Sequence, residues 1–95
     1  MPRLIWSNPA LADLQLINIW LEENASSALA IATLVKIGSR ADCLKEFRHA
    51  GRPSEGSKRV LRVLSTPYLI IYRLGRDTVE NARIRDERED RLVQP

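Results

Sequence analysis

Apolar residues in the first part of the chain recur at helical spacing, after one short extended segment. Residues 3–6 read Arg-Leu-Ile-Trp, which is aromatic and β-branched in character and contains no turn residue, so they predict a strand. From Ala10, apolar residues recur at steps of four, three and four, which predicts a helix that ends near residue 24. We expect Asn8 to be its N-cap and Pro9 its first helical residue.

A second apolar stripe follows after a few residues, with Ser26 or Ser27 as the expected cap. Its steps of four and three suit two helices that pack side by side, so the short connection predicts an antiparallel helical hairpin. Gly38 falls within the stripe and costs about 1 kcal/mol relative to alanine. We expect a neighbouring helix or strand to approach closely there. The stripe consists of Ala30, Leu34, Ile37, Ala41 and Leu44.

The pattern becomes strand-like after a loop at residues 49–57, which is rich in Gly, Pro and Ser. Strands are predicted at 58–64, 68–74 and 79–85, and the short connections between them imply antiparallel pairing. Because 68–74 is apolar on both sides, it should be the central strand. The predicted fold is α+β, with a helical hairpin packed on a small antiparallel sheet in the order β-α-α-β-β-β.

This order of elements leaves one face of the predicted sheet without a helical cover, and we expect a binding surface there. Residues 58–76 carry five Lys or Arg and no acid, although the net charge of the whole chain is only +3. Four of these five are Arg, whose planar fork grips phosphate or carboxylate in a bidentate way. An anionic partner is one interpretation. The other is that these cations are solvated residues that protect the sheet edges.

Length and composition limit the remaining classes of protein. The 95 residues form a single domain, with a charged tail expected at 86–95. Apolar runs are too short to span a bilayer, and the first residues do not resemble a secretory signal. The single cysteine, Cys43, cannot form an internal disulfide, which suggests a reducing, cytoplasmic location. We expect neither a metal site nor a cofactor.

Several short motifs occur together in a fixed order, and in combination they are fairly specific. The motifs are Asn8-Pro9, Gly51-Arg52-Pro53, Arg59-Val60-Leu61, the Pro-Tyr strand at 67–72 and the Arg-rich ending at 83–88. In that combination the chain resembles the RelE/ParE superfamily of toxins from bacterial type II toxin–antitoxin modules, over roughly residues 3–90.

The resemblance implies a toxin that a cognate antitoxin, ParD-like or similar, holds inactive in a hetero-oligomer. ParE-like members inhibit DNA gyrase, RelE-like members cut messenger RNA on the ribosome, and plasmid-borne members act in plasmid stabilisation. RelE-like nucleases generally use Tyr, or His with Tyr, just after the last strand. Residues 85–91 contain neither, which favours a ParE-like inhibitor.

Two alternatives stay open at this point. One is a metal-independent endoribonuclease that uses the Arg cluster with a carboxylate or His49 as its base. The other is an inactive descendant that only binds an antitoxin. Tyr68 and Tyr72 share a strand face and could stack on bases, although half-buried sheet residues are the preferred interpretation.

No catalytic residue is assigned, and the candidate site residues are contacts. Leu16 and Trp20, which flank the first helical stripe, are expected to bind the antitoxin. In the last strand, Asn81 is expected to share a face with Arg83 and Arg85, and it needs hydrogen-bond partners if that face is buried. The expected contacts with the target or nucleic acid are Lys58, Arg59, Arg62, Arg73, Arg83, Arg85 and Arg88.

Overall fold

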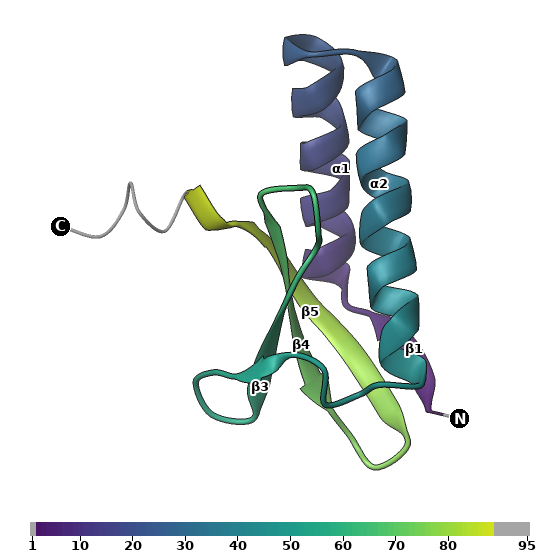
Figure 1. Ribbon diagram of the computed structural model, residues 1–95, viewed down its shortest axis with the longest axis vertical. Coiled ribbons are helices and arrows are strands. Elements are labelled where there is room, and N and C mark those ends of the chain that lie inside the picture. Colours follow the sequence, from purple (N-terminus) through teal and green to yellow (C-terminus); the bar gives the residue numbers. More distant parts are fainter. Residues whose placement is uncertain (1, 89–95) are drawn as a thin grey trace, which may run out of the picture.

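The computed structural model describes residues 2–88, which form a helical hairpin packed against a five-stranded sheet (Figure 1). The predicted order β-α-α-β-β-β is confirmed. A two-residue strand in the predicted loop and a short 3-10 helix are additions to it. The elements are β1 (Arg3–Trp6), α1 (Asn8–Asn24), α2 (Ser27–Asp42), η1 (Cys43–Lys45), β2 (Arg52–Pro53), β3 (Lys58–Arg62), β4 (Tyr68–Leu74) and β5 (Thr78–Asp86).

The sheet has the strand order β1-β5-β4-β3-β2, so β4 is central as predicted. The pairs β2–β3, β3–β4 and β4–β5 are antiparallel. The pair β1–β5 is parallel, so the sheet is mixed. The antiparallel prediction therefore holds for strands joined by short loops. It does not hold for β1, because a whole helical hairpin separates β1 from the strands that follow. Residues 89–95 of the predicted tail lie outside the described residues.

Both helices begin with a serine cap. The Ser7 hydroxyl accepts the Ala10 N–H at 3.1 Å and donates to the Ala82 carbonyl at 2.8 Å. The prediction of Asn8 as N-cap was wrong, because Asn8 is already the first residue of α1. Ser26 caps α2 by accepting the Leu29 N–H at 3.0 Å. Neither helix in residues 2–88 combines the length and apolarity that crossing a membrane requires.

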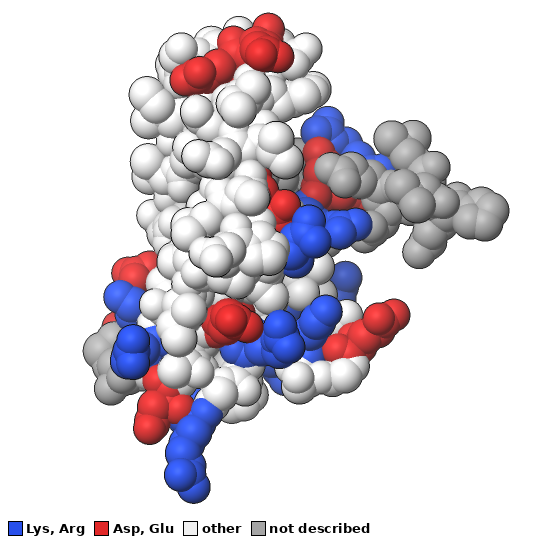
Figure 2. Space-filling model, turned by 180° about the vertical axis from the view of Figure 1, so that it is seen from behind, with Lys and Arg blue, Asp and Glu red and all other residues white. Residues whose placement is uncertain are grey.

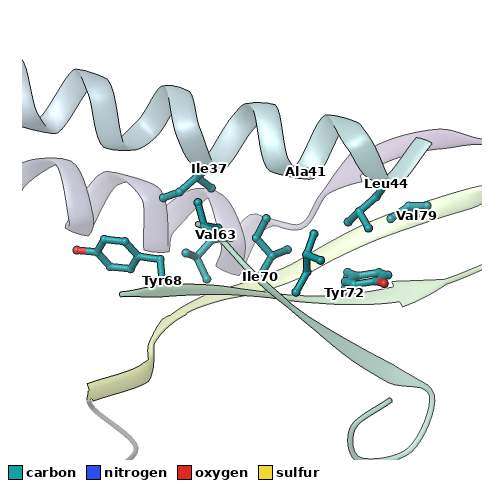
Figure 3. Close-up of a cluster of buried hydrophobic side chains, with 10 residues drawn as sticks. Ile37, Ala41, Leu44, Val63, Tyr68, Ile70, Tyr72 and Val79 are labelled. Carbon is teal, nitrogen blue, oxygen red and sulfur yellow. The ribbon is translucent and has the colours of Figure 1, made fainter. Parts of the chain in front are cut away.

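The core lies between the hairpin and one face of the sheet (Figure 3). Ile37, Ala41 and Leu44 are fully buried, which confirms the stripe predicted for the second helix. They pack against Val63, Ile70, Tyr72 and Val79 from the strands and the turn. Burying such a set of apolar side chains is the main stabilisation available to a domain of this size.

Gly38 does not lie in the buried stripe. Gly38 is exposed to solvent, and a Cβ atom added at this position would meet no other atom within 4 Å. The expected close approach of a neighbouring element is therefore absent among the described residues, and that prediction was wrong.

A bulge in β5 changes which side chains share a face. Tyr72 pairs with Asn81 and Ile71 pairs with Arg83, so Ala82 is an extra residue with no partner in the register. Because a bulge shifts the alternation by one, Asn81 faces the helices and Arg83 faces away from them. The prediction that Asn81 shares a face with Arg83 and Arg85 was therefore wrong.

Candidate binding surfaces

The sheet face away from the helices has an apolar centre bordered by cations. The register aligns Arg62, Leu69 and Arg85 in one cross-strand row, and aligns Val60, Ile71 and Arg83 in the next. Seen from behind, the charged side chains gather on the half of the molecule that contains the sheet (Figure 2). We call this surface the outer face, and it consists of Lys58, Val60, Arg62, Leu69, Ile71, Arg73, Glu80, Arg83 and Arg85.

Two ion pairs on the outer face are long and exposed. A guanidinium nitrogen of Arg73 lies 3.5 Å from a Glu80 carboxylate oxygen, and one of Arg62 lies 3.7 Å from Glu87. The two Arg side chains are 50% and 58% exposed. Pairs of this kind contribute about 0–1 kcal/mol, so an incoming carboxylate or phosphate can replace them at small cost.

Arg83 borders the outer face and is held by a carboxylate from α1. Its Nε and Nη2 atoms donate to the two Asp13 oxygens at 2.8 and 3.1 Å, and the Ile84 N–H donates to the same carboxylate at 2.9 Å. Burial opposes ionisation of Asp13, but the hydrogen bonds from Arg83 and Ile84 outweigh it and lower the pKa of Asp13. Asp13 therefore occupies the edge of β5 where β1 has ended.

Two of the predicted contact residues are directed elsewhere. Arg59 pairs with Tyr72, and its guanidinium donates to the Gly51 and His49 carbonyls at 3.0 and 3.2 Å. It holds the loop before β3 and is not part of the outer face. Arg88 binds Asp86 at 2.7 Å, and this hydrogen bond lowers the pKa of Asp86 and raises that of Arg88. Five predicted residues do meet on the outer face, namely Lys58, Arg62, Arg73, Arg83 and Arg85.

The tyrosine side chains lie on the helix side of the sheet and not on the outer face. Tyr68 and Tyr72 share a face as predicted, but that face is the buried one, and they are 6% and 0% exposed (Figure 3). The Tyr72 hydroxyl accepts the Gly51 N–H and donates to the Arg48 carbonyl, both at 2.9 Å. Stacking of bases on these rings is therefore not supported. Residues 2–88 also contain no group of three or more His, Cys, Asp or Glu side chains that could hold a metal ion.

A hollow, separate from the outer face, lies between the helical hairpin and the turn that joins β3 to β4. It has a volume of about 330 Å³ and is lined mainly by apolar atoms, with Trp20 and Leu29 on the helical side and Pro67 on the sheet side. Lys36 and Arg88 add positive charge to its wall. We call it the hairpin pocket, and its remaining lining residues are Leu21, Asn24, Ala25, Thr33, Ser65, Thr66 and Tyr68.

The two predicted antitoxin contacts are both exposed and lie beside hollows. Trp20 is 53% exposed at the hairpin pocket, and Leu16 is 65% exposed. Leu16 lines a smaller hollow of about 240 Å³ together with Asp13, Arg83 and Arg85. Sequence reasoning did not identify Asp13, although it is the only charged residue in the first half of α1.

Comparisons with known proteins agree on one family. The protein-family model described as "ParE toxin of type II toxin-antitoxin system, parDE" matches residues 4–91 of this chain. "Putative toxin Y4kP" of Sinorhizobium fredii (strain NBRC 101917 / NGR234) is 36% identical over 76 residues, which are 79% of this chain and 78% of that protein. The solved structure of the chromosomal ParDE TA system from P. aeruginosa matches with a TM-score of 0.83 and 26% identity, over 90% of this chain and 96% of that one.

Proposed function

The chain belongs to the ParE family of toxins of type II toxin–antitoxin systems, and on this premise we propose that it inhibits DNA gyrase through its outer face. A cognate antitoxin of the ParD kind holds it inactive. The inhibition is a binding event and requires no covalent chemistry by this chain.

The outer face is the observation that carries this proposal. Its centre is apolar, with Val60 and Ile71 only half-buried, and Lys58 and Arg73 stand at its rim. An apolar centre with a polar rim is the usual anatomy of a protein–protein interface. The cationic rim suits an acidic protein surface, because charge complementarity steers the encounter and fixes the register.

A ribonuclease receives less support from the same surface. Cleavage of RNA without a metal needs one group to remove the 2′-hydroxyl proton and another to protonate the leaving oxygen. Among the described residues, the outer face offers Arg, Lys and one carboxylate, Glu80, but no His or Tyr. His49 lies in the loop before β2, and both tyrosines point into the core.

The antitoxin binds the hairpin, with Trp20 as an anchor and Leu16 beside it. An exposed Trp at the margin of an apolar hollow can bury a large area on contact. Lys36 and Arg88 at the same hollow suit a segment that carries carboxylates next to its apolar side chains.

Purified toxin should inhibit DNA supercoiling by gyrase. The double variant Arg62→Glu/Arg85→Glu should inhibit at least about tenfold less well. A tenfold loss corresponds to roughly 1.4 kcal/mol of binding free energy. Arg76→Glu is the matched control, because Arg76 is exposed in the turn between β4 and β5. Wild-type toxin that leaves supercoiling unchanged contradicts the proposal. Codon-located cuts in messenger RNA that Arg83→Ala abolishes would establish the ribonuclease instead.

A further inference from the structure

Most of the hairpin carries almost no charge. Between Asp13 and Lys36 the only charged residues are Glu22 and Glu23, and the hairpin is white with an acidic tip in Figure 2. A helix that is apolar on all sides is normally buried, so we expect partners on more than one side of this hairpin. The large exposed apolar side chains on it are Leu11, Leu16, Ile19, Trp20, Leu29, Ile31 and Val35.

Two sets of residues on α2 point in different directions. Leu29, Thr33 and Lys36 line the hairpin pocket. Ile31, Val35 and Gly38 have the same spacing two residues further on, which places them about 200° around the helix axis. A helix or strand that fills the hairpin pocket therefore leaves that second side uncovered. We call the second side the back face, and it consists of Ile31, Ala32, Val35, Gly38 and Ser39.

The back face combines large exposed side chains with a glycine that no contact in the chain explains. Ile31 and Val35 are 62% and 61% exposed. Gly38 weakens the helix relative to alanine, yet nothing lies within 4 Å of its missing Cβ. A glycine at that place allows the backbone of a second helix to approach closely.

We propose that the back face binds the back face of a second copy of this chain, as an antiparallel pair of α2 helices around a two-fold axis near Val35. In such a pair, residues equally far before and after Val35 lie opposite each other. Ile31 of each copy then packs on Ser39 of the other, and Ala32 lies opposite Gly38. The large Ile31 therefore meets the small Ser39, and each contact occurs once on either side of the axis, as an isologous interface requires.

Charge favours the antiparallel arrangement. The acidic tip of one copy, Glu22 and Glu23, comes near the end of α2 in the other copy, where Lys45 lies with its side chain 36% exposed. Asp42 pairs with Lys45 at 2.8 Å within each chain, and the exposed Glu46 follows Lys45, so both acids weaken this attraction. A parallel pair would place two acidic tips together, and it would also align the two helix dipoles unfavourably.

Sedimentation of the full-length toxin tests the proposal, because the dimer has twice the 10.8 kDa mass of the chain. Val35→Glu and Gly38→Leu should each weaken the dimer by at least about tenfold in Kd. Gly38→Leu is the sharper variant, because open space at this position means that its monomer keeps the wild-type fold. Leu64→Glu, at a site that is 65% exposed outside the hairpin, should leave the dimer intact.

A disulfide trap tests the register. In a Cys43→Ser background, Val35→Cys should link two copies across the axis under mild oxidation, whereas Leu29→Cys on the pocket side should not. A wild-type toxin that stays monomeric at tens of micromolar, or a dimer that Val35→Glu and Gly38→Leu leave unchanged, overturns the proposal. The proposal is also overturned if the toxin is monomeric and its back-face variants lose only antitoxin binding. Gyrase inhibition is measured separately, and its outcome does not depend on this one.

Discussion

Asp13 is the residue that closes the open end of the β5 edge. Its side chain is only 12% exposed and is held by Arg83 and by the Ile84 N–H. Unpaired groups on a strand edge invite pairing with other chains, and proteins generally cover them. One carboxylate therefore completes the edge and also fixes the position of a guanidinium at the border of the outer face.

Asp13→Asn should lower the free energy of unfolding at pH 7 by about 1–2 kcal/mol, because the amide cannot pair with the Arg83 guanidinium. Since folding lowers the pKa of Asp13, its contribution is complete above the unfolded pKa of about 3.9 and is lost as pH falls through the folded value. Urea unfolding should therefore show a difference at pH 7 that shrinks below pH 4.

Asp77→Asn, in the exposed turn before β5, is the control for Asp13→Asn and should have little effect. A wild-type–variant difference for Asp13 that stays constant across this pH range would contradict the assignment.

Asn81 shows how far a single residue could be predicted. From the sequence, Asn81 was expected to need partners if its face is buried, and the structure shows that Asn81 is fully buried. Its Nδ2 donates to the Ile5 carbonyl at 3.3 Å, and its Oδ1 has no partner among the described residues. Its face was predicted incorrectly, because one extra residue at Ala82 leaves no clear mark on an alternating pattern.

At the scale of elements, the start of α1 is decided by a long-range contact. Ser7 and Asn8 are both good N-caps, and Pro9 is acceptable after either one. The Ser7 hydroxyl also donates to the Ala82 carbonyl, 75 residues away in sequence, and this bond ties the helix start to β5. Local preference alone could not distinguish the two caps.

Ser7→Ala should therefore lower the free energy of unfolding by about 1–2 kcal/mol, because both the cap and the bond to β5 are lost. Asn8→Ala should change it by less than about 0.5 kcal/mol. Denaturant unfolding of the two variants beside the wild type measures both values. A larger loss for Asn8→Ala would show that the cap is assigned incorrectly.

The elements themselves were largely predictable, since periodicity is a local property. Strands 3–6 and 68–74 have the predicted bounds, and the helical hairpin is present. The parallel pairing of β1 depends on tertiary contacts that periodicity does not encode. Five of the seven cations predicted as contacts lie together on the outer face, whereas Arg59 and Arg88 bind elsewhere in the chain. The strand period does separate Arg59 from Arg62, so that distinction was available from the sequence.

At the scale of the whole molecule, the outer face and the hairpin pocket are separate surfaces. The pocket is lined by the hairpin and by the turn after β3, whereas the outer face is formed by three strands. Under the proposed function, target and antitoxin thus contact different residues, and single substitutions can separate the two interactions.

Trp20→Glu should weaken antitoxin binding by about 2 kcal/mol, or roughly thirtyfold, while gyrase inhibition by the free toxin stays unchanged. Isothermal titration with the purified antitoxin and a supercoiling assay measure the two properties. Leu64→Glu is the matched control, since Leu64 is 65% exposed outside the pocket. A Trp20 variant that loses both properties would show that the two surfaces are one.

The parallel pairing of β1 with β5 has a consequence for biosynthesis. The partner of β1 is at residues 78–81, so β1 stays unpaired until the helical hairpin and three further strands have been made. Contacts between distant segments also form late in folding, because the intervening chain must be ordered first. A nascent chain therefore cannot complete its sheet until residues 78–81 have been made, so the edge of β5 is covered last.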